Sequence, residues 1–381
     1  MAYATDAVAV SQAKGPRIVA NAKAASVVAR WFLDSARDLP WRRNRTPYGT
    51  LVSETMAQQT QVMRVVPAWS SFMRRFPTVA ALARADEKSV LRAWRGLGYY
   101  RRARNLHQAA KILVRDYNGC VPAEREALLA LPGIGPYSAG AIGSMGFGRR
   151  EPIVDGNVAR VLLRLHGRRV AADARPGSKW LWSRAREYIE EARDPASANE
   201  GLMELGAIVC TPRSPKCGEC PLRRACVARR LGQEEQIPRR RATPARPVLS
   251  MAVVIVRSRG AMALVQRGSP GLWAELMFPP ALEGTRAATV AALARRFAVE
   301  CDDLERRGEF DFPTSSRRVR IAVWRLSARA SMAVRVRAPE GWRWLRPKAV
   351  LDAAVASAMQ KILQVDRAGS GRSPRSGRVA S

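Results

Sequence analysis

Acidic side chains are scarce in this 381-residue sequence: 32 Asp and Glu face 65 Lys and Arg, a formal net charge of +33 at pH 7. Such an excess favours a polyanionic partner, above all nucleic acid, although an arginine-rich solvated surface is the simpler alternative. The sequence also lacks an apolar run of the ~18 residues that a membrane helix needs. A signal-peptide pattern is missing at its start. We therefore expect a cytoplasmic protein without membrane contact, which would be nucleoid-associated if the source is bacterial. We also expect a monomer.

The spacing of apolar residues divides the chain into five segments. Residues 1–22 are small, polar and aperiodic, which predicts a disordered extension. Residues 23–230 repeat apolar side chains every three or four positions without a hairpin signal, so we expect a mainly α domain. The charged, proline-containing residues 231–248 predict a linker. Residues 249–365 combine β-branched, alternating stretches with one helical stretch, which predicts a smaller α+β domain, and residues 366–381 predict a disordered basic tail.

The glycine-rich stretch LPGIGPYSAG (131–140) suggests a close backbone approach. A Walker loop is excluded because no Gly-Lys-Ser/Thr follows, and a Rossmann turn because Ser138 stands at the third glycine and a helical stretch precedes. The remaining interpretation is helix, tight turn, helix: Gly133 and Gly135 allow the turn, and Pro136 suits the first position of the next helix. Free N–H groups there can hold a DNA phosphate. A plain helix connection is the alternative.

Four of the six cysteines lie within 17 residues: Cys210, Cys217, Cys220 and Cys226. In a reducing compartment such a cluster indicates a metal site rather than disulfides. The spacing alone leaves Zn²⁺ and an iron–sulfur cluster equally open. Cys120 and Cys301 are expected to be ordinary small apolar residues.

Two carboxylates are candidate catalytic residues, although each also has a simple structural explanation. Asp155 precedes an apolar-periodic run, where it would make a good helix N-cap. Glu54 lies in a mostly uncharged helical stretch and could be a surface residue. Neither residue indicates catalysis by itself.

Five stretches in a fixed order carry more information than any one of them: TPYGTLVSETMAQQTQV (46–62), GLGYYRRARNLH (96–107), LPGIGPYSAG (131–140), PIVDGNVARVL (152–162) and the C-x6-C-x2-C-x5-C set. In this order they resemble the MutY adenine DNA glycosylases of the endonuclease III helix-hairpin-helix superfamily. The resemblance is strong over residues 24–230 and weaker over 249–345. It implies a mainly α helix-hairpin-helix glycosylase domain with a [4Fe–4S] loop, then a smaller α+β Nudix-like domain. It also implies a base excision repair enzyme that acts on double-stranded DNA and removes adenine mispaired with 8-oxoguanine or guanine.

The resemblance gives the two carboxylates separate roles. Cleavage of an N-glycosidic bond builds positive charge on the sugar and negative charge on the base, so Glu54 is expected to protonate adenine and Asp155 to stabilise the sugar or attack it. Glu54 must then be protonated when it acts, which apolar burial would favour. Tyr137 stands where bifunctional relatives carry the Schiff-base lysine, so we expect a monofunctional enzyme that leaves an abasic site. Tyr137 and Asn157 would orient Asp155.

Access to the base requires that it leave the duplex. By resemblance, Gln59 and Tyr99 wedge into the duplex, and the arginines of GYYRRARN (Arg101, Arg102, Arg104) meet phosphates. Trp41, Arg42 and Glu200 match positions of the adenine pocket, while Ala57 replaces the leucine of many relatives.

The C-terminal part departs from the family's pattern in two places. GLWAELMFPP (271–280) resembles a Nudix signature, but the helix after it lacks the acidic Mg²⁺ ligands, so we expect no pyrophosphatase activity. In PTSSRRVRI (313–321), Ser315 is expected to hydrogen-bond the lesion, whereas Ser316 replaces a histidine. This predicts weaker 8-oxoguanine discrimination or a shift toward A·G.

Two other hypotheses stay open on the sequence. One is a glycosylase of this scaffold for another mismatched base, and the other is a non-catalytic iron–sulfur protein that binds DNA or senses redox state. The pairing of Glu200 with Glu54 favours adenine over the first, and the presence of both Glu54 and Asp155 argues against the second.

Overall fold

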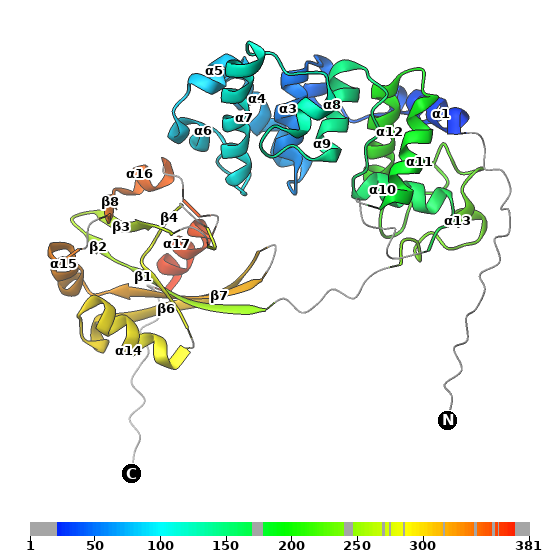
Figure 1. Cartoon of the computed structure of the whole chain (residues 1–381). Helices are drawn as coiled ribbons and strands as arrows, with labels where there is room; N and C mark the ends of the chain where they lie inside the picture. Colours follow the sequence, from blue (N-terminus) through cyan, green and yellow to red (C-terminus); the bar gives the residue numbers. More distant parts are fainter. Residues whose placement is uncertain are drawn as a thin grey trace, which may run out of the picture. The chain divides into compact units, whose positions relative to one another are not determined.

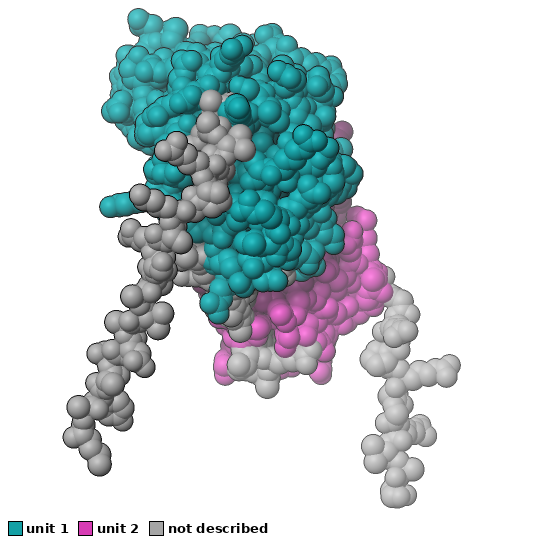
Figure 2. Space-filling view, turned by 90° about the vertical axis from the view of Figure 1, so that its right-hand side faces the viewer, with its two compact units in different colours: residues 1–90, 99–242 teal, residues 91–98, 243–381 magenta. Residues whose placement is uncertain are grey.

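The computed structural model describes residues 21–169, 178–239, 247–268, 271–273, 276–284, 286–314, 317–338, 341–352, 355–356 and 358–369. The chain forms two compact units, one of residues 1–90 with 99–242 and one of residues 91–98 with 243–381 (Figure 2). Over the part of the chain that is described, no helix is both long enough and apolar enough to cross a membrane.

The first unit is helical throughout its described residues, as its apolar spacing predicts (Figure 1). Its elements are α1 (Asn21–Ser35), α2 (Pro40–Arg43), α3 (Pro47–Ala57), α4 (Val62–Arg75), α5 (Val79–Arg84), α6 (Glu87–Ala93), α7 (Arg101–Tyr117), α8 (Arg125–Leu129), α9 (Pro136–Ala141), the π-helix η1 (Ile142–Gly146), α10 (Gly156–Leu165), α11 (Lys179–Glu190), α12 (Pro195–Ile208) and α13 (Val227–Arg230).

Local caps fix where the site-bearing helices begin. Thr46 caps α3 by accepting a hydrogen bond from the Gly49 N–H, and Pro47 takes the first helical position. Asp194 caps α12 in the same way by accepting from Ser197, and proline again follows. These short signals set the rotation of each helix and hence which side chains face inward.

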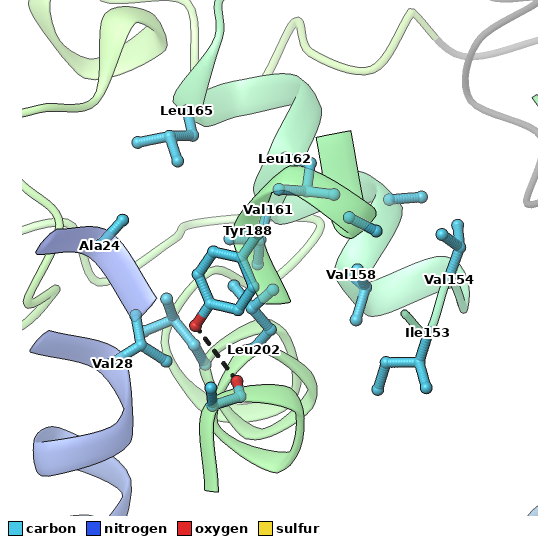
Figure 3. Packing of buried hydrophobic residues seen from close by; sticks show 14 of the residues in the cluster. Ala24, Val28, Ile153, Val154, Val158, Val161, Leu162, Leu165, Tyr188 and Leu202 are labelled. Atoms are coloured by element: carbon cyan, nitrogen blue, oxygen red, sulfur yellow. Dashed lines mark hydrogen bonds between the residues drawn. The ribbon is translucent and has the colours of Figure 1, made fainter. Parts of the chain in front are cut away.

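The core of the helical unit lies between α1, α10, α11 and α12. Val28, Leu162 and Leu202 pack there with almost no exposed surface, and Tyr188 is buried among them (Figure 3). The Tyr188 hydroxyl donates to the Ala198 carbonyl at 3.1 Å, which satisfies its polar atom inside the core. Because α10 and α12 meet in this core, the residues at the start of α10 are rigidly placed against α12.

Two boundaries of the helical unit differ slightly from the prediction. Helix α1 begins at Asn21, inside the predicted extension, whose residues 1–20 lie outside the described residues. Ile237, placed in the predicted linker, is fully buried, and its carbonyl accepts from Arg164 Nε at 2.8 Å. The helical unit therefore extends past residue 230; residues 240–246 of the linker are outside the described residues.

The second unit combines strands and helices, as the alternation after residue 249 predicts. Its elements are β1 (Val248–Ile255), β2 (Arg257–Ser258), β3 (Ala261–Gln266), β4 (Met277–Phe278), β5 (Ala281–Glu283), α14 (Arg286–Phe297), the 3-10 helix η2 (Cys301–Asp303), β6 (Leu304–Pro313), β7 (Arg318–Leu326), α15 (Ala328–Val336), β8 (Arg343–Leu345), α16 (Pro347–Asp352) and α17 (Met359–Ala368).

Two small sheets organise this unit. One has the order β5-β1-β7-β6, in which β1 runs parallel to β7 and the other pairs are antiparallel. The other joins β2, β3 and β4, with β8 paired to β3. Leu293 and Phe297 of α14 belong to the same buried cluster as Val254 of β1, so this helix covers one face of the first sheet.

The predicted disordered tail begins too early. Helix α17 continues to Ala368, and Asp366 is fully buried. Its carboxylate accepts from Arg325 Nε at 2.8 Å and from Arg257 Nη2 at 3.0 Å. Residue 366 is therefore part of the second unit, while 370–381 lie outside the described residues.

Candidate active site

Asp155 caps helix α10 and accepts hydrogen bonds from two residues at the start of that helix. Its Oδ1 accepts from the Val158 N–H at 2.7 Å, and its Oδ2 accepts from Asn157 Nδ2 at 3.1 Å. The carboxyl is half-buried; desolvation raises its pKa, while these hydrogen bonds oppose the rise. The carboxylate predicted to be functional is thus also the helix cap, and capping fixes its orientation.

Arg160 holds the Asn157 side chain in place. Its Nη2 donates to Asn157 Oδ1 at 2.8 Å and to the Gly206 carbonyl at 2.7 Å, while its Nε donates to the Cys210 carbonyl at 2.7 Å. One guanidinium therefore connects the start of α10 with the end of α12 and the first cysteine. The sequence did not single out Arg160, because two of its partners, Gly206 and Cys210, lie 46 and 50 positions away along the chain.

Two close backbone approaches bring α10 and the irregular segment before it against their neighbours. A Cβ on Gly206 would lie 2.6 Å from Asn157 Cβ, so only glycine lets α12 pass this near to the start of α10. A Cβ on Gly140 would lie 2.2 Å from the Pro152 carbonyl oxygen, which brings α9 against the stretch that leads to Asp155.

Glu54 of α3 faces inward and is only 8% exposed. Its pKa is raised to about 7, mainly by burial and in addition by the nearby charges of Glu200 and Asp155. A hydrogen bond with Tyr137 and the positive charge of Arg42 act in the opposite direction. The predicted elevation of this pKa is thus present, and apolar burial is its main cause.

Tyr137, in the first turn of α9, lies against the same carboxyl. Its hydroxyl donates a hydrogen bond to the Glu54 carboxylate and lies 3.7 Å from Met203 Sδ, an alternative and weaker acceptor. Desolvation and the surrounding carboxylates raise the pKa of the phenol well above 10. The sequence prediction had Tyr137 and Asn157 both orient Asp155; Asn157 makes that contact, whereas the tyrosine hydrogen-bonds Glu54.

Glu200 and Glu204 project from one face of α12 toward three arginines. Arg42 Nε donates to Glu200 at 3.1 Å and its Nη2 to Glu204 at 3.0 Å. Arg45 pairs with Glu200, and Arg37 Nε donates to Glu204 at 2.6 Å. Hydrogen bonds from Arg37 and Arg42 outweigh burial and lower the pKa of Glu204 to about 2, whereas burial raises that of Glu200.

The structure therefore places the predicted pocket residues Arg42 and Glu200 in contact. Glu204, Arg37 and Arg45, which anchor them, were missed by the sequence analysis. The i, i+4 spacing of Glu200 and Glu204 on α12 is the signal that could have found the second carboxylate. Trp41 is half-buried and packs edge-on against Trp69, with ring centroids 5.9 Å apart. Trp69 in turn donates to the Gly49 carbonyl of α3 at 3.2 Å.

The predicted wedge residues, Gln59 and Tyr99, are both exposed, and both have a left-handed backbone conformation. Their φ angles are +54° and +47°, values that residues other than glycine rarely adopt. The arginines after Tyr99 differ from the prediction, since Arg104 pairs with Glu87 and Arg102 donates to backbone carbonyls of α3. Of the three, Arg101 is the exposed one.

The glycine turn connects α8 and α9, as the helix-turn-helix interpretation predicts. Gly133 has a φ of +82°, and a Cβ there would lie 2.9 Å from Asn105 Cβ on α7. Gly135 stands at the N-cap of α9 with Pro136 in its first turn. The turn therefore packs tightly against the helix that follows Tyr99. Ser315 lies outside the described residues.

The residues around the four cysteines suit an anionic metal–thiolate group. Arg164 is 2% exposed, and its Nη1 donates to Cys210 Sγ at 3.3 Å and to the Thr211 carbonyl at 2.7 Å. Burial raises the pKa of Cys220 to about 12, so a thiolate there needs metal cations to stabilise it. Among the described residues, no group of three or more His, Cys, Asp or Glu is arranged to hold a single metal ion. The assignment therefore rests on the spacing, on Arg164 and on the family match below.

Comparison with known proteins decides the family. The chain is 33% identical over 398 residues to a human adenine DNA glycosylase, covering 88% of this chain and 72% of that relative. The chain belongs to the adenine DNA glycosylase family. A Mycolicibacterium smegmatis adenine DNA glycosylase is 46% identical over 194 residues, which cover 50% of this chain and 65% of that relative.

Family models divide the chain as the fold does. Residues 52–184 match the HhH-GPD superfamily of base excision DNA repair proteins, residues 210–229 the iron-sulfur binding domain of endonuclease III, and residues 251–365 the NUDIX domain. A solved thermostable thymine-DNA glycosylase aligns with a TM-score of 0.51 and 28% identity, covering 55% of this chain and 97% of that one.

These matches confirm the predicted family, fold class and cofactor. The chain is an adenine DNA glycosylase of base excision repair, an N-glycosidase that acts on DNA, and its cysteine loop is of the kind that binds a [4Fe–4S] cluster.

Proposed function

We propose that this glycosylase removes adenine mispaired with 8-oxoguanine or guanine, is monofunctional and leaves an abasic site. The observation that carries the proposal is the pair of carboxyls around Tyr137: Glu54, with a pKa of about 7, and Asp155, fixed by its cap. The two groups have different environments, which is how one site runs an acid and a charge-stabilising carboxylate together.

In the proposed reaction, Glu54 donates its proton to a ring nitrogen of adenine as the glycosidic bond breaks. The bonding electrons leave with the base, and positive charge develops on the sugar. Asp155 stabilises that charge, and its hydrogen bonds from Val158 and Asn157 favour the anionic form required. Water then adds at the sugar carbon and loses a proton, and uptake of one proton by the Glu54 carboxylate restores the acid. We expect Asp155→Asn and Glu54→Gln each to abolish base release while duplex binding persists.

Adenine would enter beside Arg42 and Glu200. The side chain of Arg42 is fixed between two carboxylates, so its orientation is set before substrate arrives. Glu200 carries an acceptor oxygen for an amino group and, when protonated, a donor for a ring nitrogen. This combination of an acceptor and a donor matches the edge of adenine, which presents an amino group and a ring nitrogen.

Strand cleavage through a Schiff base requires an amine, and the site offers a phenol in its place. Tyr137 cannot form the imine, and its raised pKa keeps it neutral. Its hydroxyl holds Glu54 instead. We expect no covalent adduct on borohydride treatment, and efficient trapping would contradict the monofunctional assignment.

The deciding experiment measures base release from duplexes with adenine opposite 8-oxoguanine, guanine, cytosine and thymine, with and without alkali. Release from the first two duplexes, with strand breaks only after alkali, supports the proposal. A thymine·guanine duplex tests the activity named for the thymine-DNA glycosylase that the helical unit resembles. Release of thymine and not adenine would overturn the substrate assignment.

Cys210, Cys217, Cys220 and Cys226 would hold the cluster, which when bound fixes the loop that carries Arg213 and Lys216 toward the DNA backbone. Glycosidic cleavage itself needs no redox step. We expect iron and acid-labile sulfide rather than zinc in the purified protein. Arg164 and Arg160 would transmit the position of the loop to α10.

A further inference from the structure

Gln59 and Tyr99 lie 40 positions apart in the chain, yet the same side chain holds both. Arg102 Nη1 donates to the carbonyls of Thr55 at 3.0 Å and Met56 at 2.8 Å, and to that of Gln58. Its guanidinium carbon also lies 5.3 Å from the centre of the Tyr99 ring, a cation–π distance.

The carbonyls that Arg102 binds are at the end of α3. The last carbonyls of a helix have no partner within the helix, and a cation there is favoured by the helix dipole. Glu54 lies one position before Thr55 in this final part of α3. The guanidinium therefore fixes the end of the helix that carries the proposed acid.

The same guanidinium fixes the turn that follows. Arg102 Nη2 donates to Thr60 Oγ1 at 3.0 Å, so bonds to Gln58 and Thr60 enclose Gln59 on both sides. Gln59 keeps its left-handed backbone and its exposed side chain between these two anchors. Burial lowers the pKa of Arg102 to about 10, which still leaves it charged at neutral pH.

We propose that Arg102 is a positioning residue for base flipping, which couples the two duplex-facing side chains, Gln59 and Tyr99, to the helix of Glu54. The inference deepens the proposed function and rests on it. A planar fork with several donors makes these contacts at once, and the single ammonium of lysine cannot. Arg102 thus acts through other residues and touches neither adenine nor the reacting sugar.

The test separates flipping from chemistry. A Glu54→Gln background stops base release, and 2-aminopurine beside the target adenine reports unstacking by its fluorescence. In this background we expect Arg102→Ala to slow the fluorescence rise about ten- to a hundredfold, because a small misplacement of positioning groups costs that much. With Glu54 intact, the single-turnover rate of adenine release should fall by the same factor. Arg102→Lys should restore little of either.

Arg115→Ala is the matched control, because Arg115 is an exposed arginine in the last turn of the same helix, α7. It should leave both the flipping rate and the adenine-release rate unchanged. Thr60→Val keeps the arginine and removes one of its bonds, so it should slow flipping less, with an unchanged melting temperature. This variant keeps the test informative if Arg102→Ala unfolds.

Three results would overturn the proposal. The first is a wild-type flipping rate in Arg102→Ala, the second is slower adenine release without slower flipping, and the third is an effect of Arg115→Ala equal to that of Arg102→Ala. Failure of the proposed function looks different: the wild-type protein would then release no adenine, whatever the variants do.

Discussion

Glu54 is an acid whose surroundings decide when it can act. Its pKa is raised to about 7, mainly by burial, and the hydrogen bond with Tyr137 keeps the pKa lower than it would be without that bond. Only the protonated form can donate to adenine, so the rate of base release should be high below this pKa and fall as pH rises through it. Glu54 is buried in the folded protein, so its deprotonation places a negative charge where water solvates it poorly. This costs free energy that the deprotonation of a surface glutamate does not.

The pH dependence can be tested through its neighbour. Under single-turnover conditions we expect the adenine-release rate to fall about tenfold per pH unit above pH 7. Tyr137→Phe removes a hydrogen bond that lowers the Glu54 pKa, so the fall should begin at a higher pH. Duplex affinity measured over the same range is the control. This account would be contradicted if the adenine-release rate of Tyr137→Phe began to fall at the same pH as that of the wild type, or at a lower pH.

Single residues differ in how far the sequence identifies them. Glu54, Asp155 and Asn157 are identified by stretches that resemble a known family, and the structure brings the three side chains together. Glu204 had a local signal, its i, i+4 spacing from Glu200. Arg160 had none, because its role depends on partners outside its own helix. In a chain with 65 basic residues, nothing local separates Arg160 from an arginine on a solvated face.

At the scale of elements, α12 and α10 can meet closely only because Gly206 has no side chain. A Cβ there would lie 2.6 Å from Asn157 Cβ and 3.0 Å from its backbone, so the start of α10 must shift. We expect Gly206→Ala to lower the adenine-release rate and to cost about 1–3 kcal/mol of unfolding free energy. Gly268→Ala is the control, since a Cβ there meets nothing within 4 Å. Equal effects of the two variants would argue against this packing.

The last helix, α17, is held by a buried charge that its sequence does not reveal. Asp366 is fully buried and accepts from Arg325 and Arg257, while its carbonyl accepts from Arg307, itself 7% exposed. Asp366→Asn would remove the counter-charge of the half-buried Arg325 and of the buried Arg307, whose Nε lies 3.9 Å from Asp366 Oδ1. We expect a loss of about 3–5 kcal/mol in urea unfolding. Asp311→Asn removes an exposed partner of Arg318 and Arg320 and should cost less than about 1 kcal/mol.

Element boundaries show where local patterns stop being sufficient. Apolar periodicity predicted the helices and the β-branched stretches predicted the strands, because each pattern follows from the local backbone geometry. Composition suggested a tail from residue 366 and a linker from 231, yet Asp366 and Ile237 are buried. Both make contacts with residues at least 41 positions away, which composition does not record.

At the scale of the whole molecule, the net charge of +33 and the buried site act on different steps. Binding to phosphates releases counterions, so affinity falls steeply with salt. The two carboxyls and Tyr137 lie where mobile ions screen them weakly. Charge should therefore bring the protein to DNA without setting the rate of bond cleavage.

This separation gives the last prediction. Between about 50 and 200 mM salt we expect duplex affinity to fall by orders of magnitude. The single-turnover rate at saturating enzyme should stay constant over the same range. Glu54→Gln, which binds without reacting, should show the same slope of log affinity against log salt as the wild type. A rate that falls with salt at saturation would mean that phosphate contacts also position the catalytic groups, and Arg101→Ala, which lowers the slope by about one, would then lower the rate as well.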